Sequence, residues 1–330
     1  MPTLLKSLHR LSTAPAFTAW VALALMLLLF ATGAASYAGF ASVQVMLNLL
    51  IDNAFLLVIA VGMSLVILSG GIDLSVGSVL ALSTMVAAWL LQTAHWPPQA
   101  VMVAVLLMGA LFGAAQGALI HFFKLQPFIV TLAGMFLARG LCYLISINSI
   151  TIDEPMFVAL SQTQLSVFGG FVSPGAVIAV LVLVAGVWLA HWTAFGRAVY
   201  AIGGNEQSAL MMGLPVGRTK VLIYAFSGVC AALAGLLFSF YMLSGYGLHA
   251  QGTELDAIAA VVIGGTMLSG GYGYVAGALS GVLTLGLIQT LIAFDGSLSS
   301  WWTKIFIGGL LFVFCVVQRL LSRSTTAAAA

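Results

Sequence analysis

The sequence predicts an all-α membrane protein with about ten transmembrane helices. Only 5% of its 330 residues are charged, whereas 62% are hydrophobic. The apolar residues form continuous runs instead of alternating at every second position, which indicates helices and not the strands of a membrane barrel. Glycine is frequent, with 36 residues, and small side chains allow helices to pack closely in lipid.

Polar, glycine or proline residues separate the apolar runs and thereby delimit the expected spans. These are residues 16–35, 45–69, 73–93, 100–123, 127–147, 174–193, 219–244, 254–268, 272–293 and 299–321. The first run resembles a signal peptide but exceeds the usual apolar length of about 7–15 residues, so we expect a retained helix. We treat residues 1–330 as one transmembrane domain, with 322–330 as a disordered cytoplasmic tail.

The basic residues predict the orientation in the membrane. With a cytoplasmic N-terminus, the inward-facing segments contain Lys6, Arg10, Lys124, Arg197, Arg218, Lys220, Arg319 and Arg323. The outward loops then contain Asp153, Glu154 and Asp295. Because cytoplasmic loops are enriched in Lys and Arg, both termini are expected in the cytoplasm.

Two regions interrupt the apolar pattern with glycine pairs, near Gly70–Gly71 and within Gly264–Gly271. Residues 66–71 (VILSGG) and 266–271 (TMLSGG) read alike, which is consistent with an internal repeat, inverted or parallel, or with coincidence. Broken helices occur in membranes where the freed backbone groups are buried in protein or line a wet cavity. Matched breaks in two halves of a transporter indicate the substrate path.

The longest inward loop, residues 194–219, contains the signals of a short helix. Asn205 is a suitable N-cap, Glu206 fits the first turn, and Gly213 followed by Pro215 ends the helix. We expect Ala209 and Met212 to face the cytoplasm and to dock into a groove of another protein. The alternative is a helix that lies on the lipid headgroups.

Several kinds of chemistry have no motif in this chain. It lacks the glycine-rich phosphate loop with a Lys, the nucleophile motif Gly-x-Ser-x-Gly and the zinc motif His-Glu-x-x-His. Cys142, Cys230 and Cys315 are isolated, which argues against a disulfide framework or a metal site. A net charge of +2 is too small to indicate nucleic-acid binding. We therefore expect no enzymatic activity, and an energy source outside the chain.

Ionisable groups inside a membrane span are costly, so each is a candidate for function. Asp73, with Ser75 nearby, either accepts hydrogen bonds from substrate hydroxyls or caps the next helix. Asn48 and Asp52 share a helix face, with Asn53 beside them, and suit a pathway mouth or a helix-to-helix hydrogen bond.

Further candidates lie in later spans. Arg139 requires an acidic partner or a wet cavity, and Asp73 and Asp52 are the available carboxylates. Glu254 and Asp256 either complement the dipole of the short eighth span, face the cavity or touch a partner. The remaining candidates for substrate contact are the amide of Gln289 and the ring of Phe136.

Three long motifs carry a resemblance to a known family. They are residues 68–78 (LSGGIDLSVGS), the pair Gly196-Arg197 with the following residues 200–213 (YAIGGNEQSALMMG), and residues 254–266 (ELDAIAAVVIGGT). The chain resembles the membrane permease subunits of bacterial ribose/galactose-type ABC importers over about residues 40–320. Residues 294–304 (FDGSLSSWWTK) are most similar to the galactofuranose branch.

The resemblance implies a bacterial inner-membrane permease that forms half of a sugar pathway. Its implied partners are a cytoplasmic ATP-binding subunit that holds ATP and Mg²⁺, a second homologous permease in a heterodimer, and a periplasmic sugar-binding protein. The chain itself then needs no cofactor. The family's coupling helix, which seats on the ATPase, is matched here by Gly196, Arg197, Asn205, Glu206, Ala209 and Gly213.

Two other classes remain open. A secondary sugar transporter would use an ion gradient, with Asp73 and Asp52 as its ion sites. A membrane scaffold or an intramembrane enzyme would not move a solute at all. The loop of residues 194–219 favours the ATP-driven class over the secondary transporter.

Overall fold

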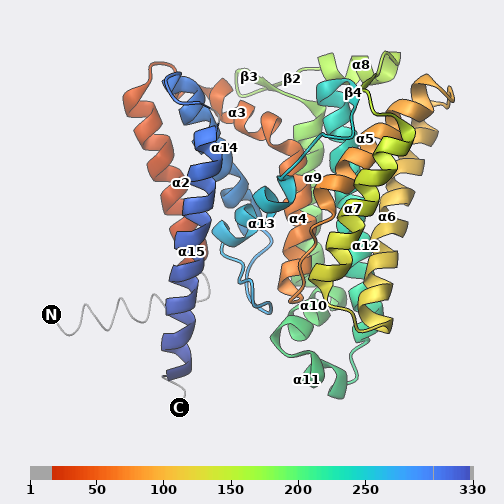
Figure 1. Cartoon of the computed structure of the whole chain (residues 1–330). Helices are drawn as coiled ribbons and strands as arrows, with labels where there is room; N and C mark the ends of the chain where they lie inside the picture. The colour runs from red at the N-terminus through yellow and green to blue at the C-terminus, as the bar shows by residue number, and fades with distance from the viewer. Residues whose placement is uncertain (1–16, 300, 328–330) are drawn as a thin grey trace.

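The computed structural model describes residues 17–299 and 301–327, with side chains from 20 to 299 and from 301 to 316. Lys6 and Arg10, and the side chains of Arg319 and Arg323, lie outside this part of the chain. Helices form most of the described structure, and the axes of the long helices lie roughly parallel to one another (Figure 1).

The helices are α2 (Phe17–Ser36), α3 (Val43–Asp52), α4 (Ala54–Leu68), α5 (Val76–Gln92), α6 (Pro98–Phe122), α7 (Pro127–Ile145), α8 (Pro155–Gln162), α9 (Pro174–Trp192), α10 (Ala194–Gly204), α11 (Glu206–Met211), α12 (Val216–Met242), α13 (Thr253–Ile263), α14 (Gly277–Asp295) and α15 (Trp301–Ala327). The strands are β1 (Ile150–Thr151), β2 (Leu165–Val167), β3 (Gly170–Val172) and β4 (Ser244–Gly245). Helix α15 thus extends through residues 322–327 of the expected tail at 322–330.

Among the described residues, five helices are long and apolar enough to cross a membrane: α6, α7, α9, α12 and α14. The number becomes six if the bent pair α3 and α4 counts as one span. The described parts of α2 and α15, and the whole of α5, are apolar but shorter. The helical fold and several spans are therefore confirmed, whereas the expected total of about ten exceeds those that meet this criterion.

The expected span 45–69 is bent by 57° between α3 and α4. Asn53 lies at the bend, is buried, and donates from Nδ2 to the carbonyl oxygen of Leu49 at 2.9 Å. An Asn side chain that bonds the backbone of its own turn competes with regular helix geometry. The sequence analysis did not predict this bend, although Asp52 and Asn53 interrupt the apolar run there.

The core of the fold lies around α4 and α12. Helix α4 is buried along nearly its whole length, and α12 packs against α4, α5 and α6. Glycines permit the contact between α6 and α12: side chains at Gly109 and Gly113 would clash with the backbone of Gly228 and Tyr224. This is the close helix packing through small residues that is typical of membrane proteins.

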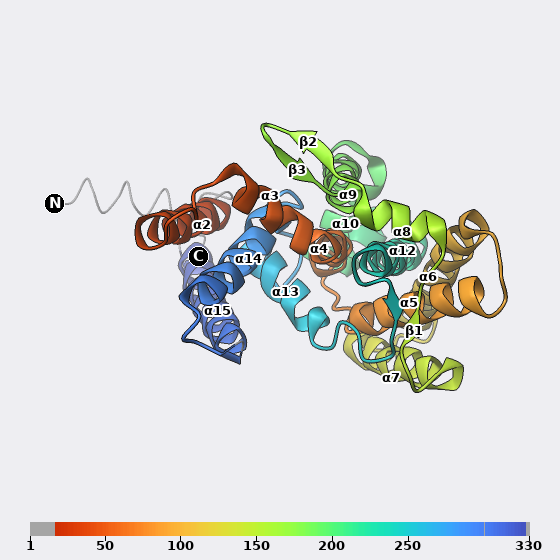
Figure 2. The ribbon, with the colours of Figure 1, turned by 90° about the horizontal axis from the view of Figure 1, so that it is seen from above.

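The two ends of the molecule differ. The strands and α8 gather at one end, whereas α10 and α11 project from the other (Figure 1). At the strand end, Ile150 of β1 pairs with Gly245 of β4 in an antiparallel register. Seen from above, α2, α14 and α15 form one group and α5, α6, α7 and α12 another, with α13 and α4 between them (Figure 2).

Candidate functional site: the interrupted helices and the projecting helix

The first glycine interruption contains a buried carboxylate. Asp73 lies between α4 and α5 and is 2% exposed. Its Oδ1 accepts from the Ser75 backbone N–H at 2.9 Å and from Ser75 Oγ at 2.6 Å. Its Oδ2 accepts from Ser227 Oγ of α12 at 2.7 Å. These contacts fix the turn that precedes α5 and join it to α12. The N-cap position of α5 is Ser75, and no side chain caps the helix there.

Sequence reasoning missed several polar neighbours of this carboxylate. Ser75 Oγ lies 3.3 Å from Oε1 of Gln116 on α6. The Gln116 Nε2 and Tyr224 Oη atoms are buried and have no hydrogen-bond partner among the described residues. A Gln within an otherwise apolar span was the available signal, because buried amides in lipid require partners.

Arg139 forms no salt bridge in the described part of the chain, so the expected pairing with Asp73 or Asp52 is wrong; the carboxylate that interacts with it electrostatically is Glu254. Its Nη1 donates instead to the backbone carbonyl oxygens of Gly247 at 2.5 Å and His249 at 2.8 Å. Both carbonyls belong to the segment between β4 and α13. Arg139 of α7 therefore holds the chain that leads into the short helix α13.

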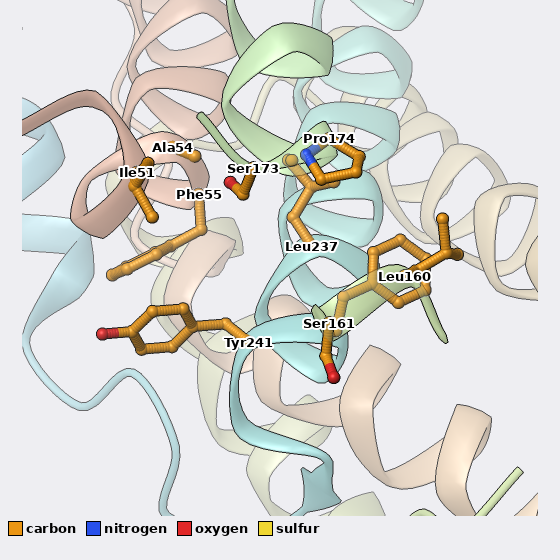
Figure 3. A pocket seen from close by; sticks show the side chains of 11 residues that line it. Ile51, Ala54, Phe55, Leu160, Ser161, Ser173, Pro174, Leu237 and Tyr241 are labelled. Atoms are coloured by element: carbon orange, nitrogen blue, oxygen red, sulfur yellow. The ribbon is translucent and has the colours of Figure 1, made fainter. Parts of the chain in front are cut away.

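The candidates near the bend between α3 and α4 lie beside a small hollow. Asp52 Oδ1 accepts from Tyr241 Oη of α12 at 3.4 Å, which is the helix-to-helix hydrogen bond considered from the sequence. Asn48 accepts from Gln44 Nε2 at 2.8 Å on the same helix face. The hollow, lined by Phe55, Leu237 and Tyr241 among others (Figure 3), has a volume of about 50 Å³. That is room for a few water molecules and not for a sugar.

A larger hollow, of about 550 Å³, lies between α14 and α15. Gln289, Thr303 and Lys304 supply its polar groups. Lys304 Nζ also pairs with Asp256 Oδ2 of α13 at 2.7 Å, which brings two sequence candidates, Asp256 and Gln289, to one place. Amide, hydroxyl and charged groups around an open space of this size can bind the hydroxyls of a small polar solute.

Glu254 and Phe136 lie elsewhere. Glu254 packs against α5, where a side chain at Gly77 would clash with Glu254 Oε2. This oxygen has no hydrogen-bond partner within the described chain. Phe136 is 65% exposed on α7 and does not line either hollow.

The loop that follows α9 folds as two helices, α10 and α11. Asn205 Oδ1 accepts from the Ser208 backbone N–H at 2.8 Å, which confirms Asn205 as the N-cap of α11. Gly213 follows α11 with φ +77°. At the beginning of α10, Gly196 is buried where a side chain would clash with the carbonyl oxygen of Ala190, whereas Arg197 is exposed.

The expectation that Ala209 is exposed is wrong. Ala209 is 0% exposed and packs with Ile202 of α10 and Val216 of α12. The exposed apolar residues are its neighbours Leu210, Met211 and Met212, at 63%, 81% and 68%. Helix α11 thus uses one face to attach to the protein and presents the other as an apolar surface.

A tyrosine joins α10 to the second glycine interruption. Burial, and then repulsion from Tyr274, raise the pKa of Tyr200 to about 12, so its phenol stays protonated. Tyr200 Oη donates to the carbonyl oxygen of Gly273 at 2.7 Å.

No group of acidic, histidine and cysteine side chains within the described residues could hold a metal ion.

Known proteins show clear similarity to this chain. A family model described as "Branched-chain amino acid transport system / permease component" matches residues 45–315. An inner membrane ABC transporter permease protein of Escherichia coli K12, YjfF, is 52% identical and the match covers 86% of each chain. The fructose import permease protein FruG of Bifidobacterium longum is 40% identical over 90% of this chain and 89% of its own. The ribose import permease protein RbsC of Bacillus subtilis is 40% identical over 83% of this chain and 84% of its own. No solved structure matches the chain.

Proposed function

We propose that the chain forms half of the membrane pathway of an ATP-driven monosaccharide importer. It belongs to the family described as the permease component of branched-chain amino acid transport systems, and its relatives include import permeases for fructose and ribose. It is a multi-pass protein of the inner membrane, in line with its apolar helices and its Escherichia coli relative. The names of the relatives, which import fructose and ribose, support a monosaccharide as the substrate.

The observation that carries this proposal is the exposed apolar surface of α11. Leu210, Met211 and Met212 are exposed and lie at the end of α11. Helix α11 itself projects from one end of the molecule (Figure 1). Exposed apolar groups in a cluster are typical of a docking surface, and a short helix fits a groove on a partner. The partner we propose is a cytoplasmic ATP-binding subunit, which binds ATP and Mg²⁺. The chain itself would need no cofactor.

The topology that we propose follows from this assignment. About ten membrane-crossing or half-crossing segments would place both termini and the α10–α11 end in the cytoplasm. The strand end, with α8, would face the periplasmic sugar-binding protein. A second, homologous permease chain would complete the pathway, and membrane lipid would cover the remaining apolar faces, including Phe136.

For the sugar we propose a path that includes the hollow at Gln289, Thr303 and Lys304, with Asp256 paired to Lys304 at its edge. Neutral sugars require hydrogen-bonding groups more than a countercharge, and this hollow supplies both donors and acceptors. A hexose in the furanose form, such as galactofuranose, is the finer proposal, supported by the resemblance at residues 294–304.

The test begins with affinity purification of the chain in mild detergent and identification of the proteins that accompany it. Met211→Asp would place a charge on the exposed face of α11 and should abolish recovery of the ATPase. Phe168→Asp is the matched control, because Phe168 is 89% exposed at the opposite, strand end. Recovery of the ATPase with Met211→Asp to the same extent as with Phe168→Asp would contradict the docking assignment.

Transport is then measured in liposomes that contain the purified assembly and its binding protein. The probes are radiolabelled D-galactose, D-ribose, D-fructose and D-xylose, with enclosed MgATP or with only a sodium or proton gradient. Uptake should require MgATP. Uptake driven by the ion gradient alone would establish the secondary-transporter class instead.

A further inference from the structure

Helix α10 meets both glycine interruptions at a single point. The backbone N–H of Gly271 donates to the carbonyl oxygen of Leu68 at 2.8 Å, so the similar stretches 66–71 and 266–271 lie against each other. A side chain at Gly203 of α10 would clash with Leu68 O and with Gly271 N. The α10 backbone is therefore seated directly on the contact between the two interruptions.

The backbone at both interruptions favours glycine, and at Gly270 the contact also leaves no room for a side chain. Gly70 and Gly270 have φ of +81° and +82°, a backbone region that favours glycine. A Cβ at Gly270 would lie 2.7 Å from Gly70 N. We call the set Leu68, Gly70, Gly203, Gly270 and Gly271 the glycine junction.

Backbone-to-backbone packing is stiff, because no side-chain rotation can absorb a displacement of one partner. Close-packed contacts of this kind tend to switch between discrete arrangements instead of deforming gradually. The junction also has a direct connection to the docking surface: α10 is followed by α11 after Asn205 alone, and Ile202 and Ala209 pack together.

We propose that the glycine junction is the positioning element that carries the movement of α11 to both interruptions at once, and so opens and closes the α10–α11 end of the sugar path. Gly203 is then a positioning residue for transport and does not touch the sugar. This inference rests on the proposed function, since it requires an ATPase that moves α11.

The experiment measures hydrogen–deuterium exchange of the permease within the intact membrane assembly, with MgATP plus orthovanadate and without nucleotide. In the wild-type assembly, nucleotide should change the exchange of residues 68–75, 198–212 and 266–274 together, by about twofold or more in each segment. Gly203→Ala would separate α10 from the two interruptions. The effect of nucleotide on hydrogen–deuterium exchange should then be confined to residues 198–212. Import per ATP hydrolysed should fall in parallel.

Gly204→Ala is the matched control, because a Cβ at Gly204 meets nothing within 4 Å. All three segments should respond in this variant as in the wild type. Tyr200→Phe provides a second probe that adds no bulk, in case Gly203→Ala fails to assemble. It removes the hydrogen bond to Gly273 and should weaken the response of 266–274 while that of 198–212 persists.

Two outcomes would overturn the junction and leave the proposed function intact. One is a wild-type response confined to 198–212, and the other is a response of Gly203→Ala that equals the wild type in all three segments. Failure to recover any ATPase with the chain would refute the proposed function itself.

Discussion

Lys220 at the beginning of α12 pairs with Glu206 of α11, with Nζ 2.7 Å from the carboxylate. Glu206 is half exposed, so the pair contributes at most about 1 kcal/mol to stability. The pair connects the first turn of α11 to α12, and we expect it to fix the orientation of Met211 and its neighbours.

Replacing Glu206 should therefore affect coupling more than folding. In Glu206→Lys, two like charges would repel α11 from α12, and we expect ATP hydrolysis to continue while sugar import falls. The measurement is the ratio of sugar imported to ATP hydrolysed in liposomes. Glu206→Gln, which keeps a hydrogen-bond acceptor, is the control and should retain most of the ratio. An unchanged ratio in Glu206→Lys would remove the pair from the coupling route.

Asp73 is expected to act on stability. Asp73→Ala would leave the Ser75 N–H and the Ser227 hydroxyl unpaired in a buried site, which should lower the free energy of unfolding by about 1–3 kcal/mol. Asp73→Asn keeps one hydrogen-bond acceptor and should lower the free energy of unfolding by less. Thermal unfolding of the purified chain in detergent measures both variants. If Asp73→Asn keeps the stability of the wild type but abolishes import, Asp73 acts on the sugar or on an ion instead.

Gln289 is expected to act on transport and not on folding. It is exposed and lines the 550 Å³ hollow, so Gln289→Ala should slow uptake by about threefold to tenfold, the effect of one lost hydrogen bond of ~0.5–1.5 kcal/mol. Thr290→Ala is the control, because the Thr290 hydroxyl bonds to Gly286 O in its own helix. Equal uptake rates for the two variants would place the sugar path outside this hollow.

The contact between α6 and α12 gives a prediction about packing. Gly113→Val would force the two helices apart at Tyr224 and should destabilise the fold by about 1–3 kcal/mol, as overpacked cores do. Gly140→Val on α7 is the control, since a Cβ there meets nothing within 4 Å. The measurement is the unfolding temperature of each variant, and equal temperatures would mean that α6 and α12 separate at little cost.

The local features of the sequence predicted the helices and the N-cap well. Long apolar runs fold as helices in a membrane because each helix satisfies its own backbone, and Asn205 caps α11 through a hydrogen bond only three residues away. Features that depend on distant residues were predicted poorly. Arg139 binds carbonyls more than a hundred positions along the chain, and Ala209 is buried by Ile202 and Val216, which the pattern of α11 alone does not show.

The two glycine interruptions show this division most clearly. Their likeness, and the need of freed backbone groups for partners, were readable from residues 66–71 and 266–271 alone, because they follow from composition and from the cost of unpaired polar groups in lipid. Only the tertiary structure shows that the Gly271 N–H donates to the Leu68 carbonyl oxygen, and that Gly203 of α10 packs against both residues. Contacts between segments far apart in a chain depend on how whole helices fit together, and helix-to-helix fit is a property of shape that no local stretch of residues encodes.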